Sequence, residues 1–424
     1  MAFKTETQCV QGTYEPHDGE PRVLPLYQST TYAYDTADAM AHLFDVPKDG
    51  HIYSRISNPT TAKLEEKIAL LEGGTAAMAT SSGMAAILLA VMTVATAGDN
   101  IITMSTIYGG SYNLFNITLR KYGIDARFVT PETSDEEIEK LIDDKTKMFF
   151  GETIANPAMV VFDFDRYAAI CKKHGLLLVI DNTLTTPCLV KPFEHGTNIV
   201  IHSTTKYLDG HASCVGGLIV DGGNFEYRNN PRYVDFCTPD ESYHGTVYVD
   251  EAPACPFAIK ARMQYMRDTG ACMSPFNAYL IHLGMETLHL RMQRHSENAL
   301  IIARALQNNP HIEWIKYPGL ENDSQHKLAE KYYNGGYSGM LVIGIKGGRE
   351  NAKKFIDSLK LIKQVTHIAD VRSCVLHPAS TTHRQLSEQD LIKCGISANL
   401  VRLSIGIENA QDILEDIENA LNNL

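Results

Sequence analysis

The sequence predicts an α/β fold in which helices cover a mostly parallel sheet. Between residue 75 and about residue 218, short apolar runs alternate with helical patterns, as they do when buried strands are joined by crossover helices. The segment 84–97 is apolar on all sides, which is typical of a helix buried within such layers. The chain has 424 residues, of which 44% are hydrophobic, enough for a large core and for two or three domains.

The elements of the large domain can be predicted in order along the chain. Residues 1–57 show little helical periodicity and are interpreted as an extended arm. Asn58 is expected to cap a helix that begins at Pro59 and ends at Gly73 and Gly74. Buried strands are expected at residues 100–104, 148–151, 176–180 and 198–202, and connecting helices at residues 135–141 and 167–174.

A second, smaller α+β domain is expected after the irregular stretch 222–262. A long helix is expected to follow Ser274 and Pro275, with Gly284 as a candidate position for a bend or break. Further strands are expected at residues 340–345 and 400–405, and helices at residues 351–359 and 410–421. The predicted division is therefore an arm at 1–57, a large domain at 58–262 and a C-terminal domain at 263–424.

Charge and cysteine usage limit the classes of partner and compartment. The formal net charge is −12 without a prominent basic tract, which argues against nucleic acid and anionic membranes as partners. The nine cysteines form no C-x-x-C pair, so we expect reduced thiols and no zinc site. The first residues contain no apolar signal core, and segment 84–97 is too short to cross a bilayer. We expect a cytoplasmic protein.

Lys206 and Asp181 suggest the chemistry. Asp181 follows an apolar run at the expected carboxyl end of a buried strand, and Lys206 follows 25 residues later between hydroxyl residues. This pattern suits pyridoxal phosphate, because a lysine amine condenses with its aldehyde and a carboxylate keeps its ring nitrogen protonated. A partly buried structural lysine and a turn aspartate are the plainer alternatives, and the pairing of the two residues argues against them.

A phosphate site is expected at the start of the apolar helix. Ser82, Gly83 and Met84 would present free backbone amides there, and the helix dipole favours an anion. Ser203 and Thr205 flank Lys206 closely and could add hydroxyl donors. Taken alone, the serine and glycine at this helix start are explained equally well by an ordinary N-cap.

Five further residues complete the predicted site. Tyr108 follows a predicted strand and could stack on the cofactor ring and assist proton transfer, while Asn156 could donate a hydrogen bond to the ring hydroxyl. Arg55, which follows Tyr53 in the arm, and Arg402 in a late strand are suited to a phosphate and a substrate carboxylate. Core, turn or surface positions are the alternatives for these residues when each is considered alone.

Together these motifs resemble the Cys/Met-metabolism family of pyridoxal-phosphate enzymes along nearly the whole chain. The matching segments are Tyr53-Ser54-Arg55, Asn58-Pro59-Thr60, Ser81-Ser82-Gly83-Met84, Tyr108-Gly109-Gly110, Asp181-Asn182-Thr183 and residues 201–211 around Lys206. The resemblance implies pyridoxal-phosphate fold type I and a homo-oligomer, usually a tetramer of tight dimers. It also implies that Tyr53 and Arg55 reach the phosphate site of a neighbouring subunit, with Tyr53 near the substrate, and that Arg402 binds the substrate α-carboxylate.

Within this family the chain is most similar to the O-acetylhomoserine sulfhydrylases. The segments that carry this likeness are 108–115, 242–245, 274–277 and 377–383. Methionine γ-lyases typically carry cysteine where Gly110 stands and methionine where Thr381 stands. His367 departs from the family, since many relatives have a small or amide residue there, near the substrate carboxylate.

The resemblance implies γ-replacement on O-acetyl-L-homoserine, with sulfide or a thiol giving homocysteine or methionine and acetate. In that reaction Lys206, Tyr108 and Asp181 would be the catalytic residues. A methionine γ-lyase or cystathionine-type γ-lyase on the same scaffold is the main alternative. A non-catalytic scaffold that binds a partner is a distant one, because every contact type that the cofactor needs is present.

Overall fold

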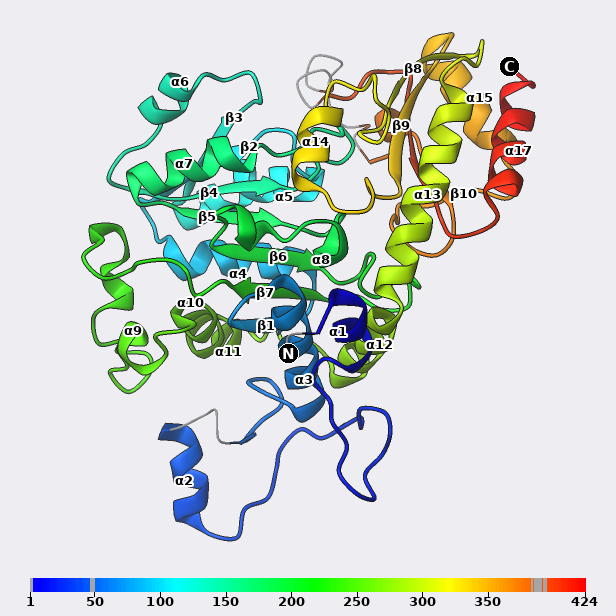
Figure 1. The fold of residues 1–424 in the computed structure, drawn as a ribbon. Coiled ribbons are helices and arrows are strands. Elements are labelled where there is room, and N and C mark those ends of the chain that lie inside the picture. Colours follow the sequence, from blue (N-terminus) through cyan, green and yellow to red (C-terminus); the bar gives the residue numbers. More distant parts are fainter. Residues whose placement is uncertain (1–2, 46–49, 383, 385–390, 392–394) are drawn as a thin grey trace.

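The computed structural model describes residues 3–45, 50–382, 384, 391 and 395–424 (Figure 1). A large sheet with its helices forms one layered unit, and a smaller sheet with its helices forms a second. His383, the last residue of one segment that carries the family likeness, lies outside the described residues. Within the part that is described, none of the helices combines the length and the apolar character that crossing a bilayer requires.

The large sheet contains, among the described residues, seven strands in the order β1-β7-β6-β5-β4-β2-β3. They are β1 (Ala76–Thr80), β2 (Asn100–Met104), β3 (Asp125–Val129), β4 (Thr146–Glu152), β5 (Leu177–Asp181), β6 (Ile199–Ser203) and β7 (Gly217–Asp221). Strands β2 to β6 pair in parallel, and β7 is antiparallel to both of its neighbours. The predicted α/β class with a mostly parallel sheet is confirmed, so the carboxyl ends of β2 to β6 share one edge.

The helices of the large unit accompany this sheet, and several of them contact its strands. They are α3 (Pro59–Glu72), α4 (Gly83–Val94), α5 (Gly109–Asn113), α6 (Asp135–Lys140), α7 (Phe164–His174), α8 (Thr186–Leu189), α9 (Tyr248–Glu251), α10 (Pro256–Lys260) and α11 (Arg267–Thr269). Asn58 caps α3, since its Oδ1 accepts from the Thr60 amide at 2.9 Å, and Gly73 ends the helix in the left-handed region. Helix α4 contacts β6 and β7, which explains its apolar sequence.

The smaller unit has a sheet of its own in the order β10-β11-β12-β9-β8. Its strands are β8 (Ile312–Lys316), β9 (Met340–Ile345), β10 (Lys363–Gln364), β11 (Cys374–Leu376) and β12 (Leu400–Ser404), and its helices are α12 (Pro275–Glu286), α13 (Leu288–Leu306), α14 (His326–Tyr332), α15 (Gly348–Ser358) and α17 (Ala410–Leu421). A separate apolar core that includes Ile343, Val401 and Ile417 holds this sheet against its helices. The domain boundaries after residues 57 and 262 remain predictions.

The N-terminal arm is less extended than the sequence indicated. Its described residues, 3–45 and 50–57, include two unexpected helices, α1 (Thr5–Gln11) and α2 (Ala37–Asp45). Helix α1 contacts α3, α12 and α13, and its Cys9 is fully buried. Seven residues are too few for a clear helical period, so packing against distant helices stabilises α1 and local sequence could not reveal it.

Gly284, the candidate position for a bend or break, does not interrupt the helix. Helix α12 continues through this residue, and the chain leaves helical geometry at Thr287. A Cβ at position 284 would overlap the carbonyl oxygen of Asp209, so the glycine allows α12 to approach the loop after Lys206 closely. Gly284 therefore serves packing beside the candidate site.

Candidate active site

The main candidate site is a cavity of about 260 Å³ at the carboxyl-terminal edge of the large sheet. Strands β4, β5 and β6 end there at Glu152, Asp181 and Ser203, and Arg402 reaches it from β12 of the smaller sheet. Ligands commonly bind at this edge of parallel sheets. The predicted residues that line the cavity are Ser82, Gly83, Met84, Tyr108, Asn156, Asp181, Ser203, Thr205, Lys206 and Arg402.

Lys206 lies in a tight turn directly after β6. Its amide donates to the Ser203 carbonyl at 3.2 Å, and the Gly210 amide donates to the Lys206 carbonyl at 2.8 Å. Burial, together with the charge of Arg402, lowers the pKa of the Lys206 amine to about 8. An amine that loses its proton near neutral pH can attack an aldehyde, because only the neutral form is nucleophilic.

Two carboxylates lie side by side at this edge. Strands β4 and β5 pair in a register that sets Glu152 opposite Asp181. Burial raises the pKa of both carboxyl groups, and the charge of Asp181 raises that of Glu152 further. The Thr183 amide donates to Asp181 Oδ1 at 2.9 Å and lowers the pKa of Asp181 against the effect of burial. Burial therefore acts on both groups, and the contacts of Asp181 oppose it, so Asp181 ionises more readily than Glu152.

A buried histidine–glutamate pair supports the charge of Asp181. His202 Nε2 lies 2.6 Å from Glu72 Oε1, and both side chains are fully buried. Asn182 Nδ2 donates to the same Glu72 oxygen at 2.8 Å. The electrostatic interaction with His202 lowers the pKa of Asp181. This favours the carboxylate form of Asp181, which can pair with a protonated ring nitrogen.

The start of α4 forms an anion site. Ser82 Oγ accepts from the Ala85 amide at 3.1 Å, which leaves the amides of Gly83 and Met84 without an acceptor inside the helix. A Cβ at Gly83 would lie 2.6 Å from Ser203 Cβ, so only glycine allows the helix start to approach β6 this closely. Free amides, the positive end of the helix dipole and the Ser203 hydroxyl therefore meet at one place.

Two threonines hold the strand ends around this anion site. Thr205 Oγ1 accepts from the Gly216 amide at 3.1 Å, which fixes its side chain at the cavity wall. Thr183 Oγ1, which also lines the cavity, accepts from the Ser203 amide at 2.8 Å. The loop that begins at Asp181 is thereby tied to the strand that precedes Lys206.

Tyr108, Asn156 and Arg402 supply the remaining polar groups. Arg402 Nη1 donates to Asn156 Oδ1 at 3.4 Å and links the two sheets. Burial lowers the pKa of Arg402 to about 10, so the guanidinium stays charged at neutral pH. The Tyr108 amide donates to Glu152 Oε1 at 2.7 Å, and its side chain is half exposed at the cavity. The cavity thus has a cation for a carboxylate and an aromatic ring at its rim.

Tyr53 and Arg55 do not reach this cavity within their own chain. Arg55 Nη1 donates to the carbonyl oxygen of Arg267, and its guanidinium lies 5.5 Å from the centre of the Tyr53 ring. Both residues are exposed on the arm. Their position leaves them accessible to a neighbouring subunit, and the role that the family resemblance implies for them stays a prediction.

Several residues of the site were missed by the sequence interpretation. They are Glu72, Glu152, Thr183 and His202, together with the contact between His367 and Lys206. Glu152 could have been found, because it directly follows the strand predicted at 148–151, as Asp181 follows the strand predicted at 176–180. Glu72 gave no local indication, since it ends an ordinary helix far from Asp181 in the sequence.

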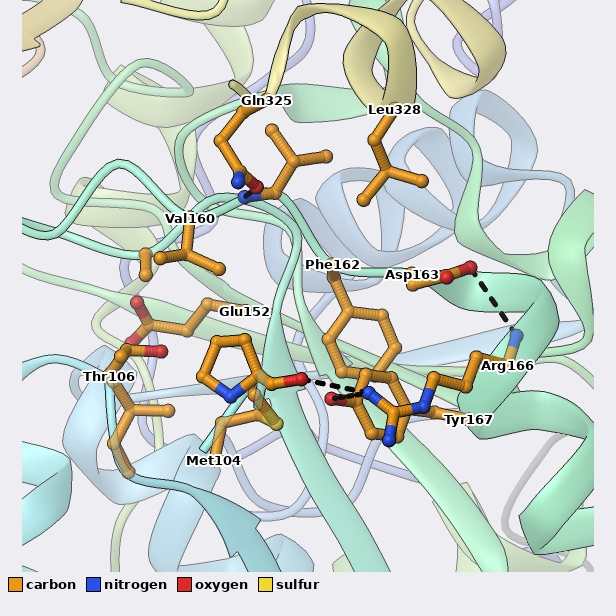
Figure 2. A pocket seen from close by; sticks show the side chains of 14 residues that line it. Met104, Thr106, Glu152, Val160, Phe162, Asp163, Arg166, Tyr167, Gln325 and Leu328 are labelled. Carbon is orange, nitrogen blue, oxygen red and sulfur yellow. Dashed lines mark hydrogen bonds between the residues drawn. The ribbon is translucent and has the colours of Figure 1, made fainter. Parts of the chain in front are cut away.

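A second cavity, of about 170 Å³, is shown in Figure 2. Glu152 lines both cavities, and the other walls of the second include Phe162 and Leu328. The cation in its wall, Arg166, donates to the Pro131 carbonyl at 2.9 Å and to Asp135 Oδ1 at 2.6 Å. Because the described lining of the second cavity includes no lysine and that of the first includes Lys206, we place the chemistry in the first cavity.

The donors of the first cavity fit pyridoxal phosphate group by group. The Lys206 amine suits the aldehyde, Asp181 suits the ring nitrogen, and the start of α4 suits the phosphate. The fit is specific because the packing of Gly83 on Ser203 brings the anion site beside the lysine turn. We infer that this is where the cofactor binds.

Comparisons with known proteins agree with this chemistry. A family described as Cys/Met metabolism PLP-dependent enzyme matches residues 6–422. The chain is 45% identical to an O-acetyl-L-homoserine sulfhydrylase of Leptospira meyeri, over 100% of this chain and 97% of that protein. It is 41% identical to a homocysteine synthase of Schizosaccharomyces pombe, over 94% of each chain. A crystal structure of a putative O-acetylhomoserine (thiol)-lyase from Campylobacter jejuni, with a pyridoxyl-lysine monophosphate, superposes with a TM-score of 0.95 at 37% identity, covering 99% of this chain and 100% of that one.

Proposed function

Since the chain belongs to the family of Cys/Met metabolism PLP-dependent enzymes, we propose that it catalyses γ-replacement on O-acetyl-L-homoserine. Sulfide or a thiol is the incoming group, and the products are acetate and homocysteine, or methionine when the thiol is methanethiol. The observation that carries the proposal is the convergence of a buried lysine, a buried carboxylate and a helix-start anion site in one cavity. Relatives named O-acetyl-L-homoserine sulfhydrylase and homocysteine synthase support this substrate class.

We assign the cofactor contacts to individual groups. Lys206 Nζ would hold the aldehyde carbon, Asp181 would accept from the ring N–H, and Asn156 would donate to the ring hydroxyl. The phosphate is bound by the amides and hydroxyls of Ser82, Gly83, Met84, Ser203 and Thr205. Tyr108 stacks on the ring.

The protein's own groups orient the substrate and move its protons. When bound, pyridoxal phosphate supplies an electron sink for the substrate α-carbon. Arg402 binds the α-carboxylate and so directs the α-hydrogen toward Lys206. Lys206 Nζ, released when the substrate amine takes its place, accepts that proton, holds it, and later returns it to the product. Acetate leaves without strong acid assistance, so Lys206 and Tyr108 suffice for the proton transfers at the chain carbons.

The packing of Gly110 determines where the Tyr108 ring can lie. A Cβ at position 110 would lie 2.5 Å from Cε1 of Tyr108, so any larger residue must displace the Tyr108 ring. Methionine γ-lyases typically carry cysteine at this position, as noted above. The position of the Tyr108 ring in this chain therefore requires glycine at position 110, and a cysteine there would force the ring into a different position.

Replacing Gly110 by cysteine is expected to move Tyr108 and change the reaction. We expect kcat/KM for O-acetylhomoserine with sulfide to fall about tenfold, because a misplaced group beside the reacting atoms slows catalysis. The ratio of eliminated to replaced product should rise, as measured by product analysis. In a Tyr108→Ala background the glycine substitution should have little further effect, since no ring remains to be displaced. Additive losses would contradict this explanation.

Product analysis tests the proposed reaction directly. The holoenzyme is incubated with O-acetylhomoserine or O-succinylhomoserine, each with sulfide or methanethiol, and separately with methionine or cystathionine alone. Homocysteine and acetate are expected from O-acetylhomoserine with sulfide. Rapid release of ammonia and 2-oxobutanoate from methionine alone would assign the chain to the γ-lyases instead.

The oligomeric state forms a further part of the proposal. We propose a cytoplasmic homotetramer of tight dimers, in which the arm of one subunit completes the phosphate site of its neighbour. The arm and α2 extend from the body of the chain (Figure 1), and Tyr27, Phe44 and Tyr53 on the arm are exposed. Exposed apolar side chains on an extended arm favour packing against another subunit. Light scattering on the purified protein would give the number of chains.

Mixed oligomers of two inactive variants should recover activity. Lys206→Ala removes the amine and Arg55→Ala removes the arm cation, so neither variant alone is expected to be active. If Arg55 acts on the neighbouring subunit, a hybrid dimer holds one complete site. Random mixing makes half of the dimers hybrids, so about a quarter of the wild-type activity is expected. No recovery in hybrids isolated by two affinity tags would show that Arg55 does not act across the interface.

A further inference from the structure

The Lys206 amine is in contact with a histidine of the second sheet. Lys206 Nζ lies 3.3 Å from His367 Nδ1. His367 lies between β10 and β11, and its neighbours Thr366 and Ile368 line the cavity. Cys374 Sγ donates to the His367 carbonyl at 3.2 Å, which ties the segment to β11. The imidazole is therefore held at the wall where the amine ends.

Asp370 faces the ring nitrogen of His367 that points away from Lys206. Its Oδ2 lies 3.6 Å from His367 Nε2, an electrostatic contact rather than a hydrogen bond. Its Oδ1 accepts from the Arg372 amide at 2.6 Å, so the carboxylate is itself held in place. A carboxylate facing Nε2 favours a proton on that nitrogen and leaves Nδ1 as an acceptor. The geometry thus forms a line from Lys206 through His367 to Asp370.

Burial and the charges around His367 keep its imidazole neutral, so that Nδ1 can accept a hydrogen bond. Burial lowers the pKa of His367, and the charges of Lys206 and Arg402 lower it further, while Asp370 and Asp209 raise it. The imidazole is therefore neutral at neutral pH. A neutral imidazole with a free Nδ1 can accept from the lysine amine whether that amine is charged or neutral.

We propose that His367 is the resting acceptor for the Lys206 amine after a substrate has displaced that amine from the cofactor. The inference rests on the proposed function of Lys206. Each turnover frees this amine into a buried cavity beside the charge of Arg402, where a polar group without a partner is costly. His367 Nδ1 provides the partner and directs Nζ, and Asp370 sets the tautomer. His367 is thus a positioning residue for the proton transfers that Lys206 makes.

A pair of ligands that differ only in their amine tests this proposal. L-norvaline has no leaving group at its γ-carbon, and its amine displaces Lys206 from the cofactor. Pentanoate has the same carbon chain and carboxylate without the amine, so Lys206 stays in place. The dissociation constant of norvaline is read from the visible absorbance of the holoenzyme, and that of pentanoate from its competition with norvaline. Neither measurement depends on turnover.

His367→Ala is expected to raise the dissociation constant of norvaline roughly tenfold, the loss that a charge-assisted hydrogen bond implies. The dissociation constant of pentanoate should not change, because that ligand leaves the lysine on the cofactor. His367→Asn keeps an acceptor near the place of Nδ1 and should recover most of the affinity. Asp370→Asn should raise the dissociation constant of norvaline less than His367→Ala does.

His195→Ala is the matched control. His195 is also partly buried with a lowered pKa, and it packs against Phe164 and Tyr332 away from the cavity. It should leave both dissociation constants unchanged. Equal weakening of norvaline and pentanoate by His367→Ala would show that His367 contacts the ligand carboxylate and would overturn the proposal, as would no change in either. A wild-type protein without visible absorbance would refute the role of Lys206 itself.

Discussion

Lys206→Ala is expected to give a protein without the visible absorbance of bound cofactor and with γ-replacement slowed on the order of 1,000-fold or more. The substitution removes the amine that lies at the cavity and is the proposed proton carrier for the α-carbon. The fold should be retained, because the turn around residue 206 is held by backbone hydrogen bonds. On the same preparation, visible absorbance checks the loss of bound cofactor, single-turnover kinetics check the slowed reaction, and circular dichroism checks that the fold is retained.

Lys67→Met provides a matched control for this variant. Burial lowers the pKa of Lys67 to about 8, the same value as for Lys206, but Lys67 lies on α3 and does not line the cavity. A depressed pKa is therefore not what identifies the cofactor lysine. Lys67→Met should keep the visible absorbance and a rate within about twofold of wild type. Loss of absorbance in Lys67→Met but not in Lys206→Ala would reject the assignment.

The parts of the site that could be predicted are those with local sequence patterns. Asp181 and Lys206 each follow a buried strand, and parallel strands bring their carboxyl ends together. Ser82 and Gly83 come directly before an apolar helix, so an anion site could be inferred from the order of residues alone. The fold class followed from the same alternation of strands and helices.

The missed parts depend on contacts between distant residues. Glu72 and His202 are 130 residues apart and meet only in the folded protein. His367 reaches Lys206 over 161 residues. Helix α1 and the continuation of α12 past Gly284 likewise depend on neighbours that no short window of sequence contains. Periodicity and motif spacing describe local geometry, and these features are set by tertiary packing.

Asp181→Asn is expected to lower kcat on the order of 100-fold to 1,000-fold while the protein still binds cofactor and absorbs in the visible. An amide at this position cannot keep the pyridine nitrogen protonated, so the ring accepts charge from the substrate α-carbon poorly. The Thr183 amide and the charge of His202 favour the carboxylate that the substitution removes. Saturation kinetics with O-acetylhomoserine and sulfide would show the loss in kcat with little change in KM.

Asp221→Asn separates this catalytic effect from the loss of any buried carboxylate. Burial raises the pKa of Asp221 to about 6, yet this residue ends β7 at the opposite edge of the sheet. Its Oδ2 accepts from the amides of Phe257 and Ala258 at the start of α10, so it stabilises the fold. Asp221→Asn should lower the unfolding temperature and leave kcat within about twofold. Asp181→Asn should lower kcat and leave the unfolding temperature nearly unchanged. Similar losses of kcat in both variants would mean that Asp181 acts through stability and not through the cofactor ring.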